Sequence, residues 1–139
     1  MIRRAKVFER LALKEKVRIQ RQMSSLVALN KEANRVSDVC NQLEDIVQEI
    51  KLKDDIKSAG FLRANAEMGF HVRSQLDTAK NRQDYINEEL ANIRRKVAFS
   101  NRRLDRSTEK AKEIRTSDRE EREQKREDAE ASRRQRTVR

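Results

Sequence analysis

The amino-acid sequence predicts an all-α fold, a long two-helix antiparallel coiled-coil hairpin with a charged C-terminal helical overhang. Three observations lead to this expectation. The chain of 139 residues is 42% charged and only 35% hydrophobic, which leaves too little apolar surface for a compact globular core. It contains no proline and only two glycines, whereas disordered chains are usually rich in both. Each half of the chain also carries a heptad repeat of apolar residues, which is the pattern of a coiled coil.

The first heptad repeat runs from residue 5 to residue 50, with steps that alternate between three and four residues. Only Glu15 and Gln22 are polar among its members, so one face of a helix would bury an almost continuous apolar seam. The predicted seam residues of this helix are Ala5, Phe8, Ala12, Glu15, Ile19, Gln22, Leu26, Leu29, Ala33, Val36, Cys40, Leu43, Val47 and Ile50.

The second repeat runs from residue 72 to residue 114 and has three polar members. Its residues are Val72, Leu76, Ala79, Gln83, Ile86, Leu90, Ile93, Val97, Ser100, Leu104, Ser107, Ala111 and Ile114. Residues 51–71 are weakly patterned and contain Ser58-Ala59-Gly60, the strongest turn signal of the chain. Because Gly60 can adopt the positive φ that ends a helix, we place the turn near residues 58–62 of a hairpin spanning residues 1–114.

A reversal at this turn brings polar members of the two seams opposite each other in two layers, and it leaves one mixed layer, in which Gln83 faces Cys40. Burying a polar group without a partner is costly, so matched polar layers favour this register over one slipped by a heptad. A parallel dimer could also use either seam. The facing pairs that the hairpin register predicts are Ile50–Val72, Leu43–Ala79, Cys40–Gln83, Leu26–Val97, Gln22–Ser100 and Glu15–Ser107.

Residues 115–139 have no seam and are dominated by nine basic and seven acidic side chains. Opposite charges recur four residues apart, as in Asp118–Arg122 and Glu121–Lys125. Each such pair supports an isolated helix by ~0.2–0.5 kcal/mol. The sequence therefore predicts that 115–139 is a charged single helix, extending to about residue 130, or a disordered tail.

The net charge of +10 is unevenly distributed along the chain. Residues 1–21 hold eight basic and two acidic side chains, and residues 94–112 hold the same numbers. The hairpin register places these two segments side by side at the end that carries the termini, while the turn end is more acidic. A basic end of this kind favours an acidic protein surface, an anionic membrane or nucleic acid as a partner.

Residues that could catalyse a reaction or bind a metal are scarce. Cys40 and His71 are the only residues of their types, and the register keeps them apart, so neither a Cys–His nucleophile pair nor a structural zinc site is expected. Cys40 is instead predicted to be a small apolar seam residue. The chain has no glycine-rich phosphate loop. We expect no enzyme activity, no cofactor, no metal and no small-molecule substrate.

Two other classes of function are less favoured. Aromatic residues make up only 4% of the chain and no recognition motif is present, which argues against nucleic-acid binding. The apolar seams are narrow and would be consumed by pairing, which argues against a helix lying on a membrane. No apolar run approaches the length of a membrane span, and the basic start lacks the apolar region of a secretory signal. The expected location is the cytoplasm.

Apolar residues near the predicted turn lie outside the paired seams. These residues are Phe61, Leu62, Met68 and Phe70. They would form either a small cap that packs the turn onto itself or an exposed apolar patch for a partner.

The turn and the helix that follows resemble a known family. The segment Ser58-Ala59-Gly60-Phe61-Leu62, followed by a second helix rich in Gln, Arg and Asn, is similar to the turn and return helix of the flagellar export protein FliJ and its YscO-like counterparts in type III secretion. The resemblance covers most of the chain. It implies a non-enzymatic cytoplasmic stalk, peripheral at the inner face of the membrane, that inserts one end into the hexameric export ATPase ring and engages the export-gate membrane protein. Export chaperones are further partners that it implies.

The resemblance also implies where partners would bind. Leu76 and Ala79 fall where the family's gate-contacting helix lies, although both also belong to the predicted seam; together with the four turn residues they are the candidate gate contacts. The basic end would enter the ring through Arg3, Arg4, Lys6, Arg10, Lys14, Arg102, Arg103 and Arg106. The alternatives to an export stalk are a generic coiled-coil scaffold or adaptor and, less favoured, a basic nucleic-acid-binding coiled coil.

Overall fold

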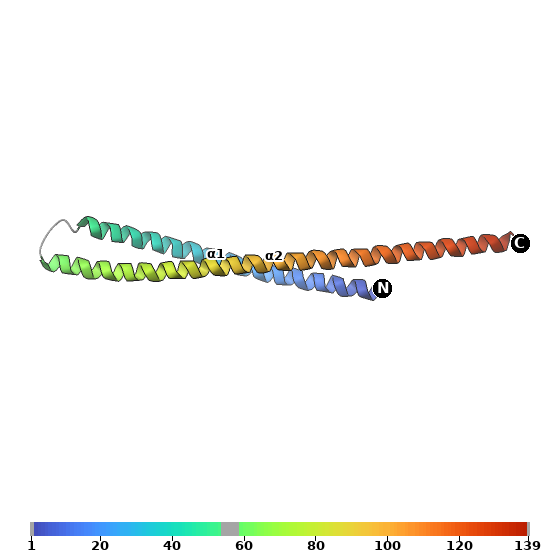
Figure 1. The fold of residues 1–139 in the computed structure, drawn as a ribbon, viewed down its shortest axis with the longest axis horizontal. Coiled ribbons are helices and arrows are strands. Elements are labelled where there is room, and N and C mark those ends of the chain that lie inside the picture. The colour runs from blue at the N-terminus through green and yellow to red at the C-terminus, as the bar shows by residue number, and fades with distance from the viewer. Residues whose placement is uncertain (1, 54–58, 139) are drawn as a thin grey trace. The chain divides into compact units, whose positions relative to one another are not determined.

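The computed structural model describes residues 2–53 and 59–138, which form two long helices (Figure 1). Helix α1 spans Ile2–Lys53 and helix α2 spans Ala59–Thr137. The two helices pack against each other, and no strand is present among the described residues. The prediction of an all-α helical hairpin is therefore confirmed.

The reversal of the chain differs from the prediction. Residues 59–62 are helical, and Gly60 lies in the first turn of α2 instead of ending a helix. Glycine is tolerated there because the first amide groups of a helix have no intrahelical partner, and the residues after it favour helix. The link between Lys53 and Ala59 consists of residues 54–58, so the predicted turn residue Ser58 lies outside the described part of the chain.

The predicted seams are confirmed in both helices, because each of their members is buried or half-buried. The seam of α2 extends further than the repeat suggested. Asn65 and Gly69 continue it before Val72, and Asp118 continues it after Ile114. A Cβ placed on Gly69 would lie 3.7 Å from Cγ2 of Ile50 in α1, so the helices approach each other closely at this glycine. The repeat missed these positions because none of the three residues is a large apolar one.

The helices form two compact units, and residues 23–95 make up one of them. Its core is apolar and draws on both helices, with Val36, Cys40, Leu76, Ile86 and Leu90 buried. Partly buried residues packed against this core are Leu26, Leu29, Ala33, Leu43 and Ala79. The thiol of Cys40 donates a hydrogen bond to Oε1 of Gln83 at 3.8 Å, as the predicted register requires. Ion pairs of Glu32 with Arg82 and of Glu44 with Lys80 join the helices outside the core.

The other unit comprises residues 1–22 and 96–139. Its buried seam residues are small or polar, and they are Ala5, Ala12, Glu15, Ser100 and Ala111. Beyond Asp118, each described side chain of α2 is exposed, yet the backbone stays helical to Thr137. The expected i,i+4 pair of Asp118 and Arg122 forms at 3.2 Å. For residues 115–139 the sequence allowed either a charged helix or a disordered tail, and the structure shows that α2 continues well past residue 130.

Candidate protein-binding surfaces

The eight basic residues predicted at the ring end are all exposed, and all lie in the unit formed by residues 1–22 and 96–139. Helix α1 carries five of them and α2 carries three. They are Arg3, Arg4, Lys6, Arg10 and Lys14 on α1, and Arg102, Arg103 and Arg106 on α2.

The only two carboxylates of residues 1–21, Glu9 and Glu15, both turn towards α2. Glu9 accepts a hydrogen bond from Arg115, and this bond, with the charges of Arg115 and Lys6, holds the pKa of Glu9 below its ordinary value of 4.5. Glu15 is only 7% exposed, and its Oε1 lies 3.2 Å from Arg18 and 3.7 Å from Arg103. Arg18 therefore pairs with a carboxylate of its own segment, whereas Arg3, Arg4, Arg10 and Lys14 are exposed.

Arg103 is held by the protein itself. Its guanidinium lies 4.4 Å from the ring centroid of Phe99, a residue that is more than half exposed, and it faces Glu15 across the helix pair. Sequence reasoning counted Arg103 among the free cations and did not single out Phe99. The i,i+4 spacing of the two residues on one helix is the signal that could have found this contact.

Two residues of the predicted polar layers, Glu15 and Gln22, have buried oxygen atoms without a hydrogen-bond partner in the described part of the chain. These atoms are Oε2 of Glu15 and Oε1 of Gln22. The sequence predicts that Glu15 faces Ser107, and the structure adds that its carboxylate forms ion pairs with Arg18 and Arg103. A serine side chain is short, whereas an arginine reaches across a full helical turn, so the arginines supply the charge that the serine layer does not.

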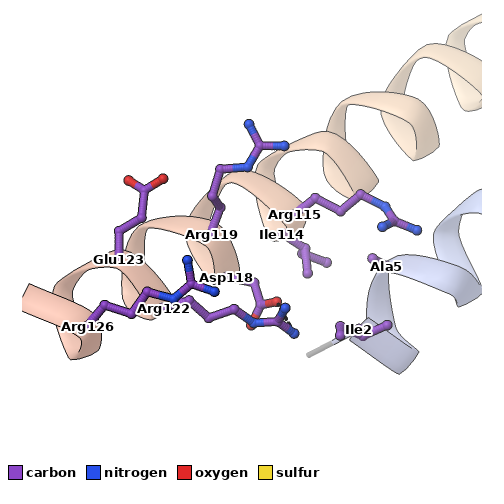
Figure 2. A pocket seen from close by; sticks show the side chains of 9 residues that line it. All are labelled: Ile2, Ala5, Ile114, Arg115, Asp118, Arg119, Arg122, Glu123 and Arg126. Atoms are coloured by element: carbon purple, nitrogen blue, oxygen red, sulfur yellow. Dashed lines mark ion pairs between the residues drawn. The ribbon is translucent and has the colours of Figure 1, made fainter. Parts of the chain in front are cut away.

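Grooves lie between α1 and α2 in this same unit. One is lined by Ala12, Leu13, Thr108, Ala111 and charged neighbours, and a second by Ile2, Ala5, Ile114 and charged neighbours. In Figure 2 the side chains of Ile2, Ala5 and Ile114 gather between the helices, whereas Arg119 and Glu123 extend away from α1.

The turn residues that sequence proposed as an apolar patch are exposed at the start of α2. Phe61 and Leu62 are just over 40% exposed, Met68 is 56% exposed and Phe70 is 77% exposed. The two candidate gate contacts of the seam lie differently. Leu76 is buried in the core of residues 23–95 and Ala79 packs against it, so a partner would reach them only if the helices separated.

The candidate chemical groups are engaged in packing or in local contacts. Cys40 is buried against Gln83, and Nε2 of the exposed His71 lies 3.3 Å from Nε2 of Gln75. Within residues 2–53 and 59–138, no group of three His, Cys, Asp or Glu residues could hold a metal ion. Neither helix, where the structure describes it, has a stretch apolar and long enough to cross a membrane.

Comparison of the chain with models of protein families, with curated proteins and with solved structures gives no match.

Proposed function

We propose that this protein is a non-enzymatic coiled-coil stalk of the flagellar or type III protein-export apparatus, acting in the cytoplasm or at the inner face of the membrane. The observation that carries the proposal is the cationic face at the start of α1. Both of its carboxylates pair with arginines, Glu9 with one of α2 and Glu15 with one of each helix, which leaves Arg10 and Lys14 exposed. A positively charged face attracts a negatively charged surface, such as the interior of an export ATPase ring that is lined by acidic residues.

The stalk has a second candidate surface at the start of α2. Met68 and Phe70 are both more than half exposed in the first turns of this helix, and exposed apolar residues of this kind favour a protein contact. In this proposal the export gate binds there, and the cationic face binds the ATPase. Export chaperones would use either surface. The hairpin acts by holding its partners, and no group of its own reacts.

The test is stimulation of a flagellar export ATPase by the purified chain. Reversing two charges in Arg102→Glu/Arg106→Glu should reduce stimulation severalfold at physiological salt, because a complementary surface becomes repulsive. Arg103 stays unchanged in this variant, since its substitution would also remove an ion pair of the buried Glu15. The control is Arg133→Glu/Arg136→Glu, the same charge change in the exposed last turns of α2. Stimulation that is equal for both double variants would refute the ring contact.

Two further measurements separate the alternatives. A generic scaffold would fold as a hairpin but would fail to retain an export ATPase in a pulldown. A nucleic-acid-binding coiled coil would shift DNA or RNA in a gel, and raising the salt concentration would abolish the shift. For the gate, Met68→Ser/Phe70→Ser should weaken binding to the gate protein and leave ATPase stimulation unchanged.

A further inference from the structure

The two grooves between α1 and α2 share part of their lining. Both are lined by Arg115 and Arg119, so they meet at these residues. Along α2 the lining extends from Thr108 to Arg126. This part of α2 makes about five turns and rises about 27 Å. We call the whole feature the terminal groove.

Up to Ile114 of α2 the floor of the terminal groove is apolar, and it is open because the buried seam residues there are alanines. Ala12 and Ala111 are both buried, and methyl side chains fill little of the space between two helix backbones. Ile2 and Ile114 continue the apolar lining towards the start of α1 (Figure 2). Leu13 stands at the edge of the groove and is 63% exposed.

The rim of the terminal groove is cationic. It contains three carboxylates, and two of them are neutralised by arginines of the rim: Glu9 by Arg115, and Asp118 by Arg122. Glu123 is the third carboxylate. Four more cations surround the groove, namely Lys16, Lys112, Arg119 and Arg126.

We propose that the terminal groove binds an amphipathic helix of a partner protein whose polar face is acidic. The lining extends for about 27 Å along α2, a length that accommodates roughly 18 residues of helix. Apolar anchors at i, i+3, i+4 and i+7 would contact its apolar part, which ends at Ile114. The free cations of the rim pair with Asp and Glu on the flanks of that helix. The partner segment becomes a third helix that packs beside α1 and α2. This inference uses the groove and its charges alone and does not rest on the export-stalk proposal.

The charge and the apolar floor of the terminal groove favour an acidic amphipathic helix over a second copy of this chain and over a flexible polyanion. The unit that contains the groove holds eight basic and two acidic residues in 1–22, and fifteen basic and ten acidic residues in 96–139, which gives +11. Two such surfaces repel, so a second copy using the same groove is disfavoured. A flexible polyanion would satisfy the cations but would leave the apolar floor uncovered.

The test uses a fluorescent synthetic peptide of about 18 residues, with leucine at the helical spacing above and mainly glutamate elsewhere. Titration of the full chain into the peptide should give a saturable rise in anisotropy. The variants Leu13→Asp and Lys112→Glu/Arg119→Glu should each weaken binding at least about tenfold. The control Lys110→Glu/Arg133→Glu changes the same charge at exposed positions outside the groove and should bind within about twofold of the natural chain.

Comparison peptides decide what the groove recognises. A glutamate peptide of equal length without leucines, and the leucine peptide with lysines replacing glutamates, should both bind at least about tenfold more weakly. Equal binding of the leucine-free peptide, or an unchanged affinity of Leu13→Asp, would overturn the proposal in favour of a surface that reads charge only. Absence of any binding, or a stable dimer of the natural chain that Leu13→Asp dissociates, would also overturn it. Circular dichroism of each variant verifies that the helices are retained.

Discussion

The thiol of Cys40 in α1 lies 3.8 Å from Oε1 of Gln83 in α2, which sets one layer of the helix pair at residues that are 43 positions apart. A slip of one heptad would place the thiol opposite Leu76 or Leu90 instead. Both leucines are buried in the same core, so the amide layer is distinct from the layers one heptad away on either side. A single polar contact inside an apolar seam is a known means of fixing the register of a coiled coil.

This layer predicts a disulfide. In Gln83→Cys the new thiol should oxidise with Cys40 within one chain, because side chains of one layer are close enough to bridge. Closing a loop of this length should stabilise the hairpin by about 4 kcal/mol in the chain-entropy account. Faster migration in a non-reducing denaturing gel, reversed by reductant, measures the bond.

The neighbouring exposed residue gives the control for this disulfide. Asp84→Cys places a thiol one position along α2 on a different face, and it should not bridge to Cys40. Oxidation of Gln83→Cys that yields mainly covalent dimers would contradict the hairpin and support a dimer of parallel helices.

Much of the fold could be predicted because the spacing of apolar residues in a coiled coil shows which residues pack between its helices. The layer of Cys40 and Gln83 followed from the heptads alone. The extension of the seam through Gly69 could not be predicted in this way, since glycine is buried there by close helix approach. Gly60 misled the prediction because a glycine is compatible with both the end and the start of a helix.

The candidate surfaces were harder to predict than the fold. The heptad positions locate Cβ atoms, whereas the end of a long side chain lies a turn away from its own Cα. Arg103 for this reason meets Glu15, although the heptads place Ser107 opposite that carboxylate. Which cations remain unpaired depends on such contacts, and the heptads do not predict them. The terminal groove also escaped prediction, because its depth follows from small residues on both helices.

Truncation of Ile86 should be among the most costly substitutions in the seam. Its side chain is only 2% exposed within the core of residues 23–95, so Ile86→Ala should lower the free energy of unfolding by roughly 2–5 kcal/mol. The neighbouring Tyr85 is 62% exposed, and Tyr85→Ala should change it by about 0.5 kcal/mol or less. Urea unfolding followed by circular dichroism at the helical band measures both. Similar losses for the two variants would show that this stretch of α2 does not pack as described.

The contact between Glu9 and Arg115 predicts a pH dependence. Because the folded-state pKa of Glu9 is lowered, the ionised carboxylate stabilises the fold above its unfolded-state pKa, and this contribution is lost as pH falls through the folded-state value. In Arg115→Gln the pKa of Glu9 should rise towards 4.5. An NMR titration of the side-chain carboxyl carbon measures it. Arg119→Gln removes the same charge one turn further along α2 and should leave the pKa of Glu9 at its value in the natural chain. An equal rise of this pKa in both variants would mean that overall charge, and not the hydrogen bond, sets it.

The contact of Glu15 with Arg103 predicts that two adjacent arginines differ in their effect on stability. Arg103→Ala should lower the free energy of unfolding by about 1 kcal/mol, because a buried carboxylate loses one of its two cations and Phe99 loses its stacked guanidinium. Arg102→Ala removes an exposed side chain and should stay within about 0.5 kcal/mol of the natural chain.

A double-mutant cycle separates the two contacts of Arg103. In a Glu15→Ala background the ion pair no longer exists, so the cost of Arg103→Ala should fall to that of the ring contact alone. An undiminished cost in that background would show that Phe99, and not Glu15, accounts for the effect of Arg103. Adding Phe99→Ala should then remove what remains of the difference, since among the described residues Arg103 contacts this ring and the carboxylate of Glu15.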